Sequence, residues 1–309
     1  MENISYSGNT VQIGDTIFFY DKEKDIVGSE VIVEAVITGV SRVGSLLVIP
    51  DEIEGLKVTK IDKKAVLGKE SLNEIIIPYT VRYMENWSLA QCRNLKKVTI
   101  FNENIRFGKG VFDECSALEH ICIGSDVADD YSALMAMVPC VMEAEYLLSE
   151  KYGGKKAWYS NWDIRLISVV GEADEDGYTA LILCGEEDVL KNPEEYCRDR
   201  RKKKAYLCLF RLFHDSDLDD EFRDIFTDYV LEHIKGCETD EAWQVMLESF
   251  ADDIAYYRMY ADMGGVNENN IDDMLRDMTE KHTEAKAYLM SYKEEHLANK
   301  HDVFDMFTL

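Results

Sequence analysis

A short pattern of apolar residues occurs three times in this chain with a strict 23-residue period. Each copy has a leucine, then an apolar residue three positions later and an isoleucine two positions after that. The copies are Ser71–Ile77, Asn94–Ile100 and Ala117–Ile123. A period of about 20 to 29 residues with this pattern is typical of units that each contribute one short strand to a stacked solenoid. A stack of this kind favours a binding surface over a catalytic site.

Alternate residues of a strand face opposite sides, so the pattern also predicts which side chains face outward. Leu72, Ile75, Ile77 and their equivalents in the other copies are expected in the core. The residues between them form three outward-facing columns. We expect these columns to be the binding surface, with the candidate residues Glu74, Ile76, Lys97, Thr99, Phe101, His120 and Cys122, flanked by Pro78 and Gly124.

The residues around the repeats resemble a known family. The run Leu47–Ile61 reads LVIPDEIEGLKVTKI, and Ser71–Pro78 and Val111–Leu118 continue the same motif. Together they are similar to the BspA-type (Treponema-type) bacterial leucine-rich repeat over about residues 28–124. The first unit departs from the strict period, because its strand at Leu46–Ile49 lies more than one period before the next strand. The resemblance implies a right-handed solenoid of short strands, and family members are commonly cell-surface or adhesion proteins.

The segment before the repeats predicts a cap for this solenoid. Two apolar or alternating runs, Thr10–Tyr20 and Ser29–Thr38, are separated by a charged segment, Asp21–Asp25, which is expected to be the turn of a β-hairpin. A solenoid needs an atypical unit over its apolar end, so we expect this hairpin to close the N-terminal edge. Residues 1–124 are therefore predicted to form a leucine-rich repeat domain with a hairpin cap.

Residues 125–309 predict a second, mainly helical and acidic domain. Tyr131–Lys151 has apolar residues at helical spacing and is expected to cap the last repeat. Two short apolar runs, Ile164–Val170 and Tyr178–Leu183, favour a small hairpin within residues 162–184. The amphipathic stretches that follow are Glu194–Phe213, Leu218–Lys235, Asp240–Met263, Ile271–Lys281 and Glu284–Ala298.

Short connections between these stretches indicate antiparallel packing in an α-solenoid or a bundle. Residues 270–293 also resemble the helical, ankyrin-like tail of some intracellular proteins of Gram-positive bacteria. The predicted fold class is thus α+β, with a short leucine-rich repeat β-solenoid followed by an all-helical domain.

Charge and cysteine usage narrow the class of partner. The chain has 309 residues and a formal net charge of -26. Residues 1–124 contain 14 Lys and Arg against 18 Asp and Glu, and the remaining residues contain 20 against 42. The negative electrostatic field of the chain disfavours binding of nucleic acid and anionic membranes and attracts basic partners.

The cysteines indicate the compartment. The eight cysteines are scattered, and no signal peptide or apolar span is evident, which predicts free thiols and a cytoplasmic location.

Two residue groups have part of the pattern of a metal site. Asp215, Asp217 and Asp219 alternate as in a calcium loop, but Asp220 and Phe226 stand where such a loop needs Gly and Glu, so we expect a helix N-terminus there. His233 and Cys237 have the spacing of two zinc ligands on a helix, but two ligands do not make a site.

Two further groups have ordinary structural explanations. The basic run Arg198–Lys204 is expected to be a solvated helix face that balances nearby carboxylates, and Trp158, Tyr159 and Trp162 are expected to be core. No catalytic, metal or cofactor site is predicted. The sequence therefore favours a non-enzymatic scaffold that binds a protein partner, and a bacterial cell-surface adhesin is the alternative.

Overall fold

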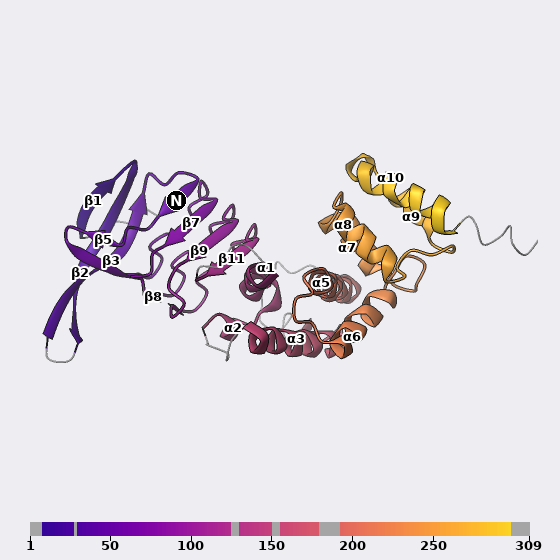
Figure 1. The fold of residues 1–309 in the computed structure, drawn as a ribbon, viewed down its shortest axis with the longest axis horizontal. Coiled ribbons are helices and arrows are strands. Elements are labelled where there is room, and N and C mark those ends of the chain that lie inside the picture. Colours follow the sequence, from indigo (N-terminus) through magenta and orange to yellow (C-terminus); the bar gives the residue numbers. More distant parts are fainter. Residues whose placement is uncertain (1–7, 28–29, 125–129, 150–154, 179–191, 298–309) are drawn as a thin grey trace, which may run out of the picture. The chain divides into compact units, whose positions relative to one another are not determined.

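The computed structural model describes residues 8–27, 30–124, 130–149, 155–178 and 192–297. The chain divides into two compact units, residues 1–162 and 163–309. The first unit contains all the described strands and the first helices after them, and the second unit is helical in its described part (Figure 1). The predicted fold class, a leucine-rich repeat solenoid followed by a helical domain, is confirmed.

The N-terminal cap is an antiparallel meander of three strands, β1 (Asn9–Ile13), β2 (Thr16–Val27) and β3 (Glu30–Ser41). The predicted turn at Asp21–Asp25 is wrong, because these residues lie inside β2. The first turn instead lies between Ile13 and Thr16, where Gly14 takes a positive φ of 59°. Glycine adopts this conformation without steric cost, whereas the charged run contains no such residue and stays extended with its side chains exposed.

The repeats build two sheets. One contains β4 (Leu46–Val48), β7 (Glu74–Ile77), β9 (Lys97–Ile100) and β11 (His120–Ile123), all parallel. The other continues from β3 through β6 (Leu56–Ile61), β8 (Tyr83–Met84) and β10 (Arg106–Phe107), and β5 (Glu52–Ile53) pairs with β6. The strands of successive repeats follow one another as a row of arrows in Figure 1.

The core of the solenoid lies between these two sheets. Leu72, Ile75 and Ile77 are fully buried, as predicted, and so are Leu95 and Val98 one repeat later. Residues at equivalent positions lie side by side because each strand pairs in parallel with the next at a spacing of one repeat. The 23-residue period is thus the separation in sequence between stacked core positions.

Buried thiols also follow the repeat. Inside the stack, the Cys92 and Cys115 thiols donate to the carbonyl oxygens of Val66 and Leu89. Each thiol therefore links its own repeat to the one before it, and each is a buried structural group.

Helices close the C-terminal end of the solenoid. The helix α1 (Asp130–Met137) packs on β11, as expected of a cap, and continues as a π-helix, Val138–Met142. The predicted single helix Tyr131–Lys151 is wrong in its extent, because Glu143 takes a left-handed conformation and α2 (Tyr146–Ser149) is separate. Pro139 stands where α1 passes into the π-helix, and it cannot donate a backbone hydrogen bond to the turn before it.

The predicted hairpin within residues 162–184 is wrong in its first strand. Ile164–Val170 belongs to the helix α3 (Lys155–Gly171). Trp162, Leu166 and Val169 are buried while Ile164 is exposed, which is the spacing of one face of a helix. The second predicted strand, Tyr178–Leu183, lies almost entirely outside the described residues.

The aromatic residues at the start of α3 are core, as predicted. The indole N–H groups of Trp158 and Trp162 donate to the carbonyl oxygens of Leu147 and Leu134, each at 3.1 Å. The Tyr131 ring packs edge-on against Trp158. Each buried indole therefore has a hydrogen-bond acceptor as well as apolar contacts.

The second unit is built from helices joined by short connections. Its described helices are α5 (Pro193–Phe213), α6 (Asp220–Leu231), α7 (Glu241–Ser249), α8 (Ile254–Asp262), α9 (Ile271–Asp277) and α10 (Thr283–Tyr292), with a 3₁₀ turn at Glu280–His282 and a π-helix at Lys293–Leu297. α5 packs against α6, α7 and α8, and α10 packs against α8 and α9.

Side-chain caps set the helix boundaries in this unit. The predicted stretch Asp240–Met263 is two helices, because the Asp253 side chain caps α8 at the amide of Ala255. Asp219 caps α6 in the same way, at the amide of Glu221, as predicted for the acidic segment.

A buried ion pair holds the second unit together. Arg211 on α5 meets Asp163 with Nε at 2.6 Å from Oδ1 and Nη2 at 3.1 Å from Oδ2. Arg211 also donates to the carbonyl oxygens of His214 and Ser216. The two charged side chains are 0% and 1% exposed, so each buried charge is compensated by the opposite charge of the other.

Candidate binding surface

The outer face of the four-stranded sheet carries the predicted columns. The register places Leu46, Glu74, Lys97 and His120 in one column. The next column contains Val48, Ile76, Thr99 and Cys122. The sheet therefore brings together side chains that lie a whole repeat apart in sequence.

Two residues of this face are absent from the predicted set. Leu46 and Val48 on β4 are 48% and 51% exposed, which is as much as the predicted Phe101, 51% exposed directly after β9. The alternation of Leu46, Leu47 and Val48 is a signal that could have found them. Their unit stands outside the 23-residue period, so the period alone does not predict its outward-facing residues.

The last strand does not contribute to an open face, which corrects the prediction for His120 and Cys122. The thiol-bearing Cys122 is only 3% exposed, and the ring Nδ1 of His120 lies 3.1 Å from the Ser132 hydroxyl on α1. The reason is tertiary, because α1 packs on β11 and covers the strand that the repeat pattern leaves outward. The accessible surface, called the strand face below, is Leu46, Val48, Glu74, Ile76, Pro78, Lys97, Thr99 and Phe101.

The burial of Cys122 gives a direct labelling prediction. We expect iodoacetamide to modify the exposed Cys237 in the native protein and to modify Cys122 only after unfolding, because α1 blocks access to its thiol. Mass spectrometry of the peptides measures both sites in one sample. Equal labelling of Cys122 and Cys237 under native conditions would contradict the packing of α1 on β11.

The strand face is mainly apolar, with one ion pair on it. Lys97 Nζ lies 3.6 Å from Glu74 Oε1, and the two side chains are 40% and 38% exposed. Such a pair contributes about 0 to 1 kcal/mol to stability, so it does not determine the fold. Beside it, Val48 on β4, Ile76 on β7 and Phe101 directly after β9 present apolar groups. A half-exposed aromatic side chain among aliphatic ones is typical of the centre of a protein interface.

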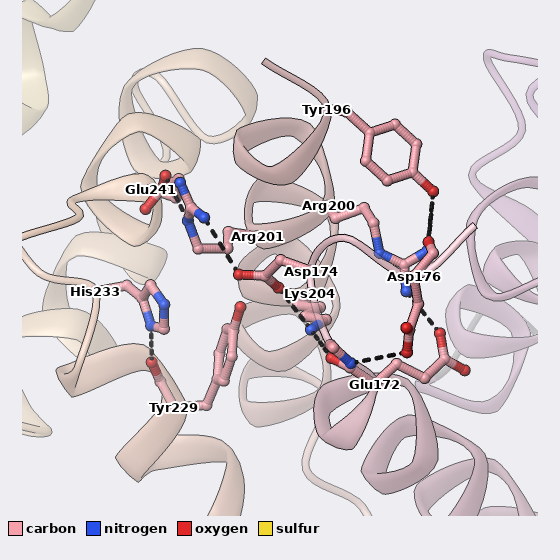
Figure 2. Close-up of polar contacts among 11 residues, drawn as sticks. Glu172, Asp174, Asp176, Tyr196, Arg200, Arg201, Lys204, Tyr229, His233 and Glu241 are labelled. Carbon is pink, nitrogen blue, oxygen red and sulfur yellow. Dashed lines mark hydrogen bonds and ion pairs between the residues drawn. The ribbon is translucent and has the colours of Figure 1, made fainter. Parts of the chain in front are cut away.

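The basic run Arg198–Lys204 differs from its prediction. It lies on α5 and balances carboxylates, as expected, and Arg198 at its start is exposed. Arg201 and Lys204, however, are not part of a solvated face (Figure 2). Lys204 is 3% exposed, with Nζ 2.8 Å from Asp174 Oδ1, and Arg201 bridges Asp174 and Glu241 at 3.2 and 2.8 Å. These cations tie the segment after α3 to α5 and α7 and are not available to a partner.

This cluster predicts a pH dependence of stability. Burial alone would raise the pKa of Asp174, but Lys204 and Arg201 hold it below its usual value. Because the folded pKa lies below the unfolded one, the stabilisation is present above pH about 4 and is lost as the pH falls further. We expect Asp174→Asn to flatten the loss of unfolding free energy between pH 5 and pH 3, measured by urea denaturation. The exposed Asp51→Asn is the control, and a slope for Asp174→Asn equal to that of the wild type would contradict the assignment.

His233 and Cys237 have structural partners in place of a metal. His233 Nδ1 lies 2.8 Å from the Tyr229 carbonyl oxygen, and the Cys237 thiol faces the carbonyl of Leu231. Among the described residues, no group of three or more metal-ligating side chains comes together. No helix in the same part of the chain is long and apolar enough to cross a bilayer.

Comparison with known proteins agrees with the repeat geometry. Residues 49–134 match the BspA type leucine rich repeat region in six copies. No curated protein matches the chain. The ankyrin-like character of residues 270–293 stays a prediction.

Solved leucine-rich repeat structures are similar to part of the chain. A leucine-rich repeat protein from Bacteroides capillosus is 25% identical, with a TM-score of 0.30, and covers 38% of this chain and 84% of its own. The Treponema pallidum leucine-rich repeat protein is 24% identical, with a TM-score of 0.28, over 35% of this chain and 53% of its own, so the chain spans about half of that relative. A leucine-rich cell surface protein of Faecalibacterium prausnitzii is 20% identical, with a TM-score of 0.30, and the match covers 44% of this chain and 35% of that protein. The family match and the stacked parallel strands together show that the chain carries a BspA-like leucine-rich repeat region.

Proposed function

We propose that this chain is a non-enzymatic scaffold that binds a protein partner, and that the strand face is its binding surface. The observation that carries the proposal is a row of apolar side chains across neighbouring strands, formed by the exposed Val48 on β4, the partly exposed Ile76 on β7 and the exposed Phe101 directly after β9. Contiguous exposed apolar groups of this kind cost solubility and typically mark interaction sites. Leucine-rich repeats are in general protein-interaction modules.

The chemistry of the face indicates what the partner offers. Phe101 supplies a large apolar anchor, and the aliphatic side chains beside it exclude water from the contact. The Glu74–Lys97 pair at the same face adds polar groups that a partner can hydrogen-bond. The net charge of -26 favours encounter with a basic protein.

A pull-down with matched variants tests the proposal. The double variant Ile76→Asp and Phe101→Asp places charge on the strand face, and Arg93→Asp places it on an exposed position outside that face. We expect specific partners recovered by the wild-type chain to fall at least tenfold with the double variant and to persist with Arg93→Asp. Circular dichroism confirms that both variants remain folded. If every partner persists with the double variant, the strand face is not the binding surface.

The proposed location is the cytoplasm. The described cysteines are all free thiols, which is usual in a reducing compartment. Immunoblotting of cell fractions from the source bacterium tests this proposal. Recovery in the soluble cytoplasmic fraction is the expected result, and recovery at the cell surface would favour the adhesin alternative with the same strand face.

A further inference from the structure

One edge of the long strand β3 is open near its start. β3 pairs with β2 along its length, but it pairs with β6 only from Ala35 onward. The first residues of β6, Leu56 and Lys57, pair with β5 instead. The two strands therefore diverge, and among the described residues no strand pairs with β3 at Val31–Val33 on the side away from β2.

The backbone groups on this edge are arranged to accept another strand. The amide of Asp62, next to the end of β6, donates to the Ile37 carbonyl oxygen at 2.8 Å, so the Ile37 backbone faces away from β2. β3 pairs with β2 without a register shift from Ile37 to Val31, so along this stretch the direction alternates from residue to residue. The N–H and C=O groups of Val33 and Val31 therefore face the same way as those of Ile37, toward the side where β6 has diverged.

The side chains along the edge are apolar and unusually exposed. Val31, Ile32 and Val33 are 62%, 39% and 38% exposed, on both faces of the β2–β3 ribbon. An extended, apolar strand with an unpaired edge is a template for adding a further strand, and proteins normally protect such edges. Within this ribbon the charged residues Asp21–Asp25 lie on β2, the strand farther from the open edge.

The edge opens onto a groove of about 1330 Å³ across the starts of β6, β8 and β10. This volume exceeds the roughly 300–1,000 Å³ of small-molecule sites, so it suits a polypeptide segment better. On its wall, Glu34 is fixed by the Thr59 hydroxyl at 3.0 Å and by Arg82 at 2.5 Å. Arg82 also lies 3.4 Å from Asp25. The acidic side chains of the groove are therefore already paired.

The groove retains unpaired positive charge. Lys57 and Arg106 line it, are exposed, and form no ion pair within the described residues. With Arg82 they bring three cations to a groove that has two carboxylates, in a chain whose overall charge is strongly negative. An occupant with an acidic side chain is thus complementary to this groove, whereas a basic one is not.

We propose that this groove binds an extended, acidic segment of a protein partner, which adds to β3 as a further strand and places a carboxylate on Arg106. Main-chain hydrogen bonds to Val31 and Val33 hold the segment, and the apolar side chains with Arg106 select it, as in β-strand addition generally. The groove lies on the sheet that contains β3, separate from the strand face, so the proposal does not depend on the function proposed above.

A defined peptide tests the proposal on the full chain. The probe is a fluorescein-labelled, capped peptide of alternating valine and threonine with an aspartate at each end. One control peptide has lysine in place of aspartate, and another is N-methylated at alternate amides so that it cannot pair with an edge strand. Fluorescence anisotropy measures the affinity of each. We expect saturable binding of the aspartate peptide and at least tenfold weaker binding of both controls.

Two protein variants test the same contact from the other side. Arg106→Glu removes the positive charge, and Arg93→Glu is its charge-matched control outside the groove. Val33→Pro removes an edge N–H that the β2–β3 ladder does not use, which an edge strand tolerates. We expect Arg106→Glu and Val33→Pro to weaken binding at least tenfold and Arg93→Glu to leave it within twofold.

Three results would each overturn the proposal. They are no saturable binding of the aspartate peptide, equal binding of the N-methylated or lysine peptide, and unchanged affinity of Arg106→Glu. The peptide controls use the wild-type chain, so they remain decisive if a variant is misfolded.

Discussion

Replacement of Arg211 by alanine is expected to lower the free energy of unfolding of the second unit by about 3–5 kcal/mol. Arg211 and Asp163 are almost fully buried and joined by two hydrogen bonds. Without the guanidinium, the Asp163 carboxylate would stay in the interior with no compensating charge, and the His214 and Ser216 carbonyls would lose a donor. Urea denaturation followed by circular dichroism measures the loss.

The same variant changes the pH dependence of stability. Burial raises the pKa of Asp163 even beside Arg211, and removal of the arginine is expected to raise it further. A folded pKa above the unfolded one means that the folded state binds more protons, so the stability of Arg211→Ala falls as the pH rises above about 4.

Two further variants distinguish the effect of breaking the buried ion pair from the effect of removing a charged side chain in general. Arg223→Ala breaks the exposed pair with Asp215, whose atoms are 2.9 Å apart, and should cost at most about 1 kcal/mol. The double change Arg211→Met and Asp163→Leu removes both charges and should recover much of the stability lost by Arg211→Ala. If Arg211→Ala is no more destabilising than Arg223→Ala, the pair is not buried as described.

Replacement of Trp162 by alanine is expected to destabilise the first unit by about 3–5 kcal/mol. The indole is fully buried and donates to the Leu134 carbonyl oxygen, so its loss opens a cavity beneath α1 and leaves that carbonyl without its donor. Trp162→Phe keeps most of the apolar contact and should cost less. Thermal and urea unfolding measure both changes.

Tyr79→Ala is the control for this position. Tyr79 is 67% exposed, and its truncation should change stability by no more than about 0.5 kcal/mol. Equal effects of Trp162→Ala and Tyr79→Ala would show that the aromatic cluster of Trp158, Tyr159 and Trp162 is not part of the core.

The repeat strands could be predicted because the residues that recur with the 23-residue period are also the residues that must be buried. Apolar residues that recur with a strict 23-residue period must stack on their equivalents to leave water, and this fixes the strands β7, β9 and β11. The second sheet was not predicted, since β8 and β10 are only two residues each and too short for an alternating pattern.

The errors arose where tertiary contacts decide the outcome. Ile164–Val170 is apolar enough for a strand or a helix, and only its burial on one side of α3 distinguishes them. The strand pattern alone predicts that His120 and Cys122 are exposed, but α1 packs on that strand in the fold. Lys204 and Arg201 lie in a run that looks solvated, but in the fold they pair with carboxylates distant in sequence, Lys204 with Asp174 and Arg201 with Glu241.

Site-specific crosslinking tests the central claim, that the strand face binds a protein, most directly. A photoreactive benzoylphenylalanine is placed at Phe101, and in a second protein at the exposed Arg93 as the control. After irradiation in cells of the source bacterium, we expect a discrete crosslinked species with the probe at residue 101, lost when Ile76→Asp is added, and none with the probe at residue 93. Absence of any crosslink at residue 101, with the same probe crosslinking at residue 93, would contradict it.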